Sequence, residues 1–341
     1  MAKMSEFFSL RIRLWGLLTA LGFLAVLGTI AGFFGQYAWW MDLGSHFRAQ
    51  YVVFFAVLAA CYGLGRKSRW AFGALALAFV NAVPVAMFLL PLATTTPVSS
   101  ASCRAMLINV NTQRGSPSRV IAAIRRENPD IVVLEEISDK WVEALGPILE
   151  SYAIRKIQTR DDNFGIGLLS RVPCVSTQVV YMGEAEVPSI LTEATLEGRR
   201  LILVATHPLP PGGPNYSAYR NEQLEVVARR VAAMDGPVLL LGDLNVTPWS
   251  HYYRRFVSTS GLSDAATGRT IMPTWPTFCS LLWIQIDHCF HSDEIDIGAT
   301  RVGENVGSDH YPLIVDFALR PAEGEVSSLP VTAYTSPAEG E

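Results

Sequence analysis

Several features are scarce in this sequence, and each shortage narrows the class of protein. The chain has five cysteines, but none forms a Cys-x-x-Cys pair, so the ligand spacing of a zinc finger is missing. Four of them follow residue 100: Cys103, Cys174, Cys279 and Cys289. Isolated buried thiols are the favoured interpretation, and disulfides are the alternative outside the cytoplasm. No internal repeat is visible, which argues against a repeat architecture.

Charged residues are absent from two long apolar stretches, residues 14–34 and 70–92. Each can cross the roughly 30 Å of a bilayer core, which takes about 20 helical residues. Residues 47–65 are a weaker candidate, in which Arg48 could reach the interface. No small-residue cleavage site follows the first stretch, which disfavours a cleaved signal peptide. We therefore expect residues 1–93 to be a membrane region with three transmembrane helices.

Basic residues predict the orientation of these helices. One cluster precedes residues 14–34 and consists of Lys3, Arg11 and Arg13. The other lies between residues 47–65 and 70–92 and consists of Arg66, Lys67 and Arg69. The positive-inside rule places both clusters in the cytoplasm. Everything after Pro91 would then lie on the outer, periplasmic or extracellular side of the membrane. If residues 47–65 do not span, this orientation reverses.

The remainder divides by composition. Residues 94–102 are a polar linker of small residues, residues 103–320 a soluble domain, and residues 321–341 a tail without hydrophobic periodicity that we expect to be disordered. Residues 1–100 hold seven of the 27 basic and two of the 31 acidic residues, leaving 20 basic and 29 acidic, a net charge of −9. Proteins that bind many phosphates usually have a basic face. The balance argues against bulk duplex DNA, although a local basic patch stays open.

Short apolar runs in the soluble domain predict many strands and few helices. Amphipathic patterns predict helices at 118–128 and 219–234. Strands are expected at 105–111, 131–135, 165–170, 175–181, 201–206, 238–241, 284–290 and 311–317. Strict strand–helix alternation is lacking, so we expect helices packed outside two face-to-face sheets.

Polar residues gather at the ends of these apolar runs. They are Asn109, Glu135 and Glu136, His207, Asp243 and Asn245, Asp287, and the pair Asp309 and His310. Taken singly, most have ordinary explanations as turns or caps. Asp287 is the exception, because a carboxylate inside an apolar strand needs a partner or a metal. Converging carboxylates, amides and imidazoles are what metal-assisted phosphoester hydrolysis requires, with oxygen ligands suited to Mg²⁺ or Mn²⁺.

The motifs VVLEEI, VATHP, GDLNVTP, IDHCF and GSDHYPL, in this order, resemble the endonuclease/exonuclease/phosphatase superfamily. The resemblance runs from about residue 105 to 317. The preceding membrane helices resemble those of a bacterial, inner-membrane-anchored subgroup. The superfamily includes deoxyribonucleases, abasic-site endonucleases, inositol-phosphate phosphatases and neutral sphingomyelinases. The resemblance implies a four-layer α/β sandwich, two packed β-sheets flanked by helices, with the active site at one end of the sheets.

The resemblance also implies roles for individual residues. Glu136 would be the main metal ligand, with Asn109 and Asp309 completing the metal environment. Asp243 and Asn245 would orient the attacking water and the phosphate. His310, held by Asp287, would activate water or stabilise charge on the phosphoryl group. His207 would act as a general acid for the leaving oxygen, as the matching histidine does in some members.

Other residues remain open at this stage. Asn111 could share the role of Asn109, and Glu136 is preferred to Glu135 because it precedes the apolar Ile137. Arg171 is a candidate for the substrate's phosphate. Tyr219, Arg220, Trp275 and Thr277 could line a groove, whereas His251, His288 and His291 are expected to be structural.

These observations lead to a membrane-embedded, Mg²⁺- or Mn²⁺-dependent phosphoesterase. Its substrate would be a lipid headgroup, a nucleic acid or a phosphorylated metabolite. A surface nuclease and a non-catalytic binding module with the same fold are the alternatives. A transporter is disfavoured, because the candidate helices carry few polar groups. No protein partner can be inferred.

Overall fold

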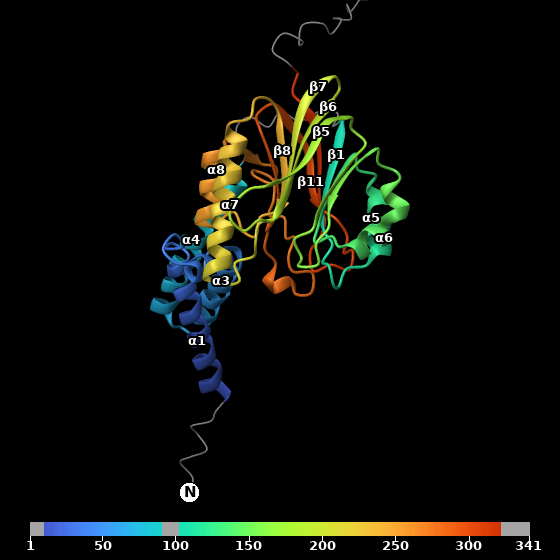
Figure 1. The fold of residues 1–341 in the computed structure, drawn as a ribbon. Helices are drawn as coiled ribbons and strands as arrows, with labels where there is room; N and C mark the ends of the chain where they lie inside the picture. The colour runs from blue at the N-terminus through green and yellow to red at the C-terminus, as the bar shows by residue number, and fades with distance from the viewer. Residues whose placement is uncertain (1–9, 91–101, 322–341) are drawn as a thin grey trace, which may run out of the picture.

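The computed structural model describes residues 10–90 and 102–321. Most of the predicted linker and tail lies outside these residues. The described chain forms a set of N-terminal helices beside an α/β domain with two β-sheets, and Figure 1 shows α5 and α6 on one flank of the sheets and α7 and α8 on the other. The predicted arrangement of two packed sheets with outer helices is confirmed.

Each sheet has six strands. In the first, the order is β11 (Ile295–Val302), β12 (Leu313–Leu319), β1 (Cys103–Asn109), β2 (Ile131–Glu135), β4 (Ile166–Ser170) and β3 (Ile154–Gln158). In the second, it is β5 (Cys174–Tyr181), β6 (Pro188–Leu196), β7 (Arg199–Thr206), β8 (Val238–Asp243), β10 (Asp287–His291) and β9 (Ser263–Asp264). The pairs β1–β2 and β7–β8 are parallel, and the other pairs are antiparallel.

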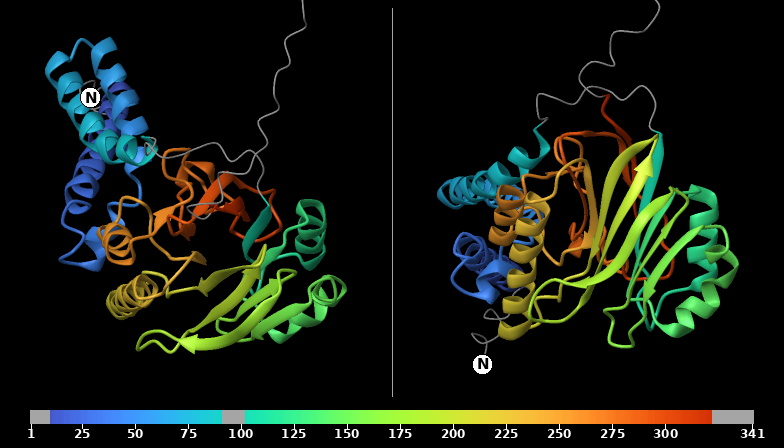
Figure 2. Two further views of the ribbon diagram at one scale, coloured as in Figure 1. Left: turned by 90° about the horizontal axis from the view of Figure 1, so that it is seen from above. Right: turned by 45° about the horizontal axis from the view of Figure 1, so that its top comes forward.

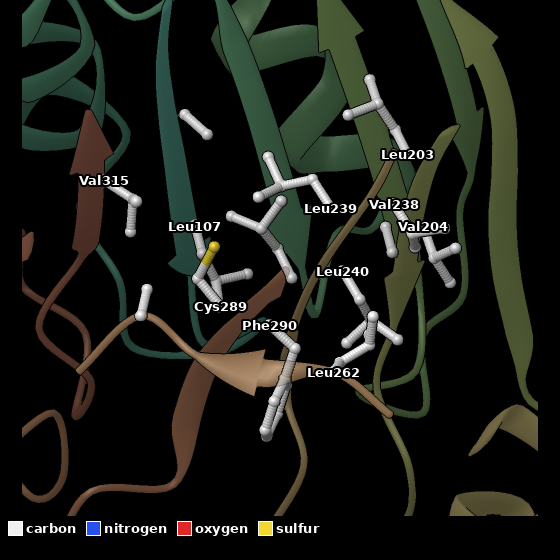
Figure 3. Packing of buried hydrophobic residues seen from close by; sticks show 14 of the residues in the cluster. Leu107, Leu203, Val204, Val238, Leu239, Leu240, Leu262, Cys289, Phe290 and Val315 are labelled. Carbon is white, nitrogen blue, oxygen red and sulfur yellow. The ribbon is translucent and has the colours of Figure 1, made fainter. Parts of the chain in front are cut away.

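Successive side chains of a strand point to opposite faces, so each central strand contributes side chains to two cores. In β1, Met106 and Ile108 pack under the outer helices α5 (Pro117–Glu127) and α6 (Asp139–Leu149), whereas Leu107 packs in the other core. There Leu107 and Val315 of the first sheet approach Leu239 of the second (Figure 3). Strands buried on both faces read as continuous apolar runs, as β2 and β8 do.

The same alternation directs polar residues inward where the strands end. Odd-numbered residues of β1 and β2 face the second sheet, since Leu107 and Val133 belong to the core that contains β7 and β8. Asn109 and Glu135 are the next odd positions, and both are buried. The alternation therefore carries an amide and a carboxylate into the space between the sheets at one end.

Helices α7 (Pro214–Ala232) and α8 (His251–Ser260) cover the second sheet. The N-terminal helices α1 (Leu10–Ala31), α2 (Trp39–Leu43), α3 (Arg48–Leu64) and α4 (Ser68–Leu89) lie on that same flank (Figures 1 and 2). Phe88 of α4 packs edge-on against Trp249, with ring centroids 5.6 Å apart. The N-terminal helices are thus docked on the α/β domain.

Helices form at all three predicted membrane stretches. Among the described residues, however, only α4 is both long and apolar enough to cross a membrane. Residues 15–31 and 48–64 are apolar but shorter. The bundle of three spanning helices is therefore not confirmed, and one span of adequate length is present.

Candidate active site

The predicted polar residues converge at the end of the sheets where β1, β2 and β8 finish and β10 begins. Asn109 and Glu135 are partners across parallel strands, and Asp243 and Asp287 are partners across antiparallel strands. Two carboxylates placed directly opposite each other repel, which is tolerated only with a compensating positive charge. A positive charge at this end of the sheets would therefore relieve the repulsion between the carboxylates.

Glu136 turns away from its strand into an open cavity. It has a positive φ of 61°, unusual for a residue with a side chain, and this bend separates it from Glu135. The Asn109 amide donates to a Glu136 carboxylate oxygen at 3.0 Å, and the backbone N–H of Thr112 donates to the other at 3.3 Å. Burial raises the pKa of Glu136. The preference for Glu136 as the cavity-facing acid agrees with this geometry.

Asp309 faces the same cavity. The Asn111 amide donates to it at 2.6 Å and the Trp275 indole N–H at 3.3 Å. Burial by itself would raise the pKa of Asp309, but His310 and these two donors lower it. Asp309 is therefore held as a carboxylate, and Asn111 and Trp275 join the site through it.

His310 lies between two carboxylates. Its Nδ1 is 2.9 Å from Asp287, and its Nε2 is 3.6 Å from Asp243. Burial opposes its charge, but these carboxylates raise the pKa of His310 to about 10. Burial, followed by the Asp287 charge, raises the pKa of Asp243 to about 8. The site thus holds a cationic imidazole beside an acid able to accept a proton near neutral pH.

His207 has the opposite electrostatics. Its Nε2 is 3.6 Å from Asp243, its ring contacts Phe164, and its buried Nδ1 has no hydrogen-bond partner. Burial, followed by the charge of His310, lowers the pKa of His207 to about 3. His207 is a neutral imidazole at physiological pH, which suits a hydrogen-bond donor better than a strong acid.

Glu135 is a site residue that the sequence did not single out for a role. Its buried carboxylate accepts from the backbone N–H of Asp243 at 3.1 and 3.2 Å. Burial, followed by Asp243 and Asp287, raises the pKa of Glu135 well above its usual value. The adjacent Gly242 has no room for a side chain, because a Cβ there would lie 1.9 Å from the Thr206 carbonyl oxygen. Glu135 clamps the Gly-Asp-Leu-Asn loop to the first sheet.

Asn245 is fixed within that loop. Its φ of 54° is left-handed, its N–H donates to Asp243 at 2.9 Å, and its amide donates to the Pro208 carbonyl at 3.0 Å. The guanidinium of Arg220 donates to the Asn245 carbonyl at 2.8 Å and to Asp42 at 3.1 Å. Asp42 comes from α2, so an N-terminal residue supports the Gly-Asp-Leu-Asn loop.

The cavity at this end of the sheets has a volume of about 540 Å³. Glu136, His207, Asp243, Asn245, Asp309 and His310 line its polar side. The N-terminal residues Leu43, His46 and Phe47 form another part of its wall. No sequence motif pointed to these three residues, because they become neighbours of the site only through docking of the helices.

Arg171 is not part of this site, which corrects its assignment to substrate binding. It follows β4, whose end pairs with the start of β2, whereas the site lies at the end of β2. Its guanidinium donates to Asn128 at 2.7 Å and stacks on Tyr152. Antiparallel pairing therefore carries Arg171 to the opposite end of the first sheet.

The other polar candidates divide between the site and the framework. Trp275 lines the cavity, Thr277 donates to the Ser308 carbonyl, and Tyr219 lies on a neighbouring surface hollow. His288 has its Nδ1 2.8 Å from Asp264 and its Nε2 2.9 Å from the Val246 carbonyl. His288 thus has a structural place, as expected.

The charges fit a divalent cation. Four acids, Glu136, Asp243, Asp287 and Asp309, interact with one cationic imidazole, so negative charge is in excess even when Asp243 holds a proton. Ligand atoms of Asp243, Asp287 and His310 also lie within 4.8 Å of one another. His310 already engages Asp287, however, and a charged imidazole cannot be a metal ligand. Glu136 and Asp309, with the Asn109 amide, are the better oxygen donors for a hard cation.

The protein is thus an α/β sandwich with a cluster of acids, amides and imidazoles at one end of its two sheets. The model of the endonuclease/exonuclease/phosphatase family matches residues 106–310. The chain belongs to this family. No curated protein sequence matches it closely enough to count as a relative.

Solved structures share the fold. An endonuclease/exonuclease/phosphatase from Beutenbergia cavernae has 21% identity and a TM-score of 0.54, covering 65% of this chain and 72% of its own. The human Nocturnin catalytic domain with bound sulfate has 19% identity and a TM-score of 0.53, covering 64% and 94%. D. rerio TDP2 with a single-strand DNA product has 18% identity and a TM-score of 0.53, covering 63% and 98%.

Proposed function

We propose that this protein is a divalent-metal-dependent phosphoesterase, in which water attacks a phosphodiester or phosphomonoester. The observation that carries the proposal is the excess of buried carboxylates around His310 at the strand ends. Such a cluster is costly for folding alone and useful for hydrolysis. The family and the structural neighbours support the same chemistry.

Glu136, Asp309 and Asn109 would hold Mg²⁺ or Mn²⁺, which would neutralise charge on the phosphoryl oxygens when bound. Asp243, whose pKa is raised to about 8, would accept the proton of the attacking water when it is ionised. Its neighbour Asn245 would orient the phosphate. The charged His310, fixed by Asp287, would stabilise the negative charge that develops on phosphorus-bound oxygens.

His207 has a narrower role than the family resemblance implies. A group with a pKa of about 3 is almost never protonated at neutral pH. We propose that the neutral ring donates a hydrogen bond to the leaving oxygen as the phosphorus–oxygen bond breaks. The leaving alkoxide then takes its proton from solvent or from the protonated Asp243.

We also propose that the N-terminal helices anchor the protein in a bacterial inner membrane, with the α/β domain on the outer side. Most large apolar side chains exposed among the described residues belong to α1, α3 and α4. Large exposed apolar faces mark contact with lipid or protein. Helix α4 is long enough to span, and the basic residues of the loop before it favour a cytoplasmic position for that loop.

The direct test is hydrolysis of bis(p-nitrophenyl) phosphate by the purified full chain with Mg²⁺ or Mn²⁺. Glu136→Gln and His310→Asn should each lower kcat/KM at least about 100-fold, a typical cost of losing a group that stabilises the transition state. Arg171→Ala is the matched control and should retain activity. Inactive wild type with either metal, or wild-type rates in both site variants, would refute the proposal.

A further inference from the structure

The cavity lining is mixed in its chemistry. Besides the polar groups, it includes the apolar side chains of Leu43, Phe47, Phe164, Ile284 and Ile286 and the ring of Tyr216. Among the described residues that line the cavity there is no lysine or arginine. A substrate that fits this lining therefore has one phosphoryl group for the polar residues and an apolar portion for the apolar ones.

The N-terminal part of the apolar wall is held firmly. The Ser250 hydroxyl donates to the Asp42 carboxylate, with its oxygen 2.9 and 3.0 Å from the two carboxylate oxygens, and Asp42 also forms the ion pair with Arg220. The His46 Nδ1 is 3.0 Å from the Thr247 hydroxyl. Leu43 and Phe47 lie between and beside these anchor points. They are fixed components of the cavity wall.

The apolar wall continues onto an exposed apolar rim. The loop around the short helix η2 (Ser280–Leu282) exposes Phe278, Leu281, Leu282 and Trp283 between the cavity residues Trp275 and Ile284. The Gln50 amide of α3 donates to the Trp283 carbonyl at 2.6 Å. The rim thus joins the cavity mouth to the N-terminal helices.

We infer that the substrate is an amphiphilic phosphoester, one whose esterified group carries an apolar chain that contacts Leu43 and Phe47. This inference rests on the proposed phosphoesterase function and specifies its substrate class. Hydrolysis adds water across one phosphorus–oxygen bond, so a diester yields a phosphomonoester and an alcohol. The apolar chain of the substrate binds because its contact with the cavity wall excludes water. The phosphoryl group binds to the polar residues of the site.

A nucleic acid is a poorer fit to the same observations. A polynucleotide needs cationic contacts for the phosphates on either side of the scissile one. The described lining supplies no such contact, and the chain after residue 100 has a net charge of −9 from 20 basic and 29 acidic residues. An isolated phosphoryl group needs only the metal and His310.

The experiment uses the full chain in lipid nanodiscs with Mn²⁺ and a series of p-nitrophenyl alkyl phosphodiesters from methyl to octyl. The KM of wild type should fall with chain length by roughly two- to fourfold per buried methylene until the cavity is filled. Leu43→Ser and Phe47→Ser should each flatten this dependence, by raising the KM of the octyl ester more than the KM of the methyl ester. Trp40→Ser, at an exposed residue that does not line the cavity, is the matched control.

The control also removes the effect of the bilayer, because partition of long-chain esters into lipid is the same for every variant. A chain-length dependence that is absent in wild type, or unchanged in both wall variants, overturns the inference. So does a single-stranded oligonucleotide that is hydrolysed with a higher kcat/KM than the octyl diester. No hydrolysis of any diester in the series would instead refute the proposed function itself.

A second experiment distinguishes a membrane lipid from a soluble amphiphile as the substrate. Release of headgroup from phosphatidylglycerol vesicles identifies a membrane lipid, and hydrolysis of the octyl diester without release identifies a soluble amphiphile. Both results support the shared chemistry. Turnover of neither, by a protein that hydrolyses the methyl ester, overturns it.

Discussion

Arg220 and Asp42 form a buried ion pair across 178 residues of sequence, with 3.1 Å between nitrogen and oxygen and each side chain 1% exposed. Arg220 belongs to α7 of the α/β domain, and Asp42 belongs to the N-terminal helix α2. The same guanidinium holds the Asn245 carbonyl. One side chain therefore contributes both to the docking of the N-terminal helices and to the shape of the Gly-Asp-Leu-Asn loop.

Removing one partner of this pair should be worse than removing both. Asp42→Ala leaves a buried cation without a partner, which typically costs about 3–5 kcal/mol. We expect a similar loss of unfolding free energy and a lower kcat, because Arg220 no longer supports Asn245 in one geometry. The double variant Asp42→Ala with Arg220→Met should be more stable than Asp42→Ala alone. Thermal unfolding of the four proteins measures this coupling, and purely additive effects would contradict it.

Gly242 should tolerate no side chain. A Cβ at this position would lie 1.9 Å from the Thr206 carbonyl oxygen, so Gly242→Ala must push β7 and β8 apart where Asp243 meets the Glu135 carboxylate. We expect a loss of at least about 2 kcal/mol and of most activity. Gly146→Ala is the control, in helix α6, where nothing lies within 4 Å of the added Cβ. The free energy of unfolding of Gly146→Ala should rise by about 0.5–1 kcal/mol. Equal stability of the two variants would contradict the close packing at Gly242.

His46 should make docking sensitive to acid. Burial lowers the pKa of His46 to about 4, while Asp42 and Arg220 exert smaller, opposing effects. A depressed histidine pKa means that the unfolded state binds the proton first. Stability is therefore unaffected above pH 6.5 and falls as the pH decreases from 6.5 towards 4.

At pH 4.5 the free energy of unfolding should be lower by about 2–3 kcal/mol than at pH 7 because of His46. His46→Gln, which keeps a hydrogen-bonding group near Thr247, should lose that part of the pH dependence. Melting temperatures between pH 7.5 and 4.5 for wild type and variant provide the comparison. Parallel curves over this range would show that His46 does not titrate on unfolding.

Much of the site could be predicted because its chemistry is local in sequence. Glu136, Asp243, Asn245, Asp309 and His310 each follow or begin an apolar run, and carboxyl ends of neighbouring strands meet at one edge. The strand 131–135 was predicted with its observed bounds, since a strand buried on both faces is a continuous apolar run.

Other features depend on long-range packing. In strand β6 the adjacent polar residues Thr192 and Glu193 interrupt the apolar residues, so it gave no continuous apolar run to detect. Arg171 was misplaced because a Ser-Arg-Val turn does not show which end of a sheet it occupies. The contribution of Leu43 and Phe47 to the cavity follows from an ion pair between segments far apart, which no local pattern encodes.

The central claim is that Glu136 holds a divalent ion in a pocket of excess negative charge. Mn²⁺ binding to the full chain, followed by electron paramagnetic resonance of the free ion, tests it without relying on catalysis. We predict one tight site in wild type and in Arg171→Ala, and loss of that site in Glu136→Gln. No bound Mn²⁺ in wild type, or an unchanged affinity in Glu136→Gln, would contradict the account.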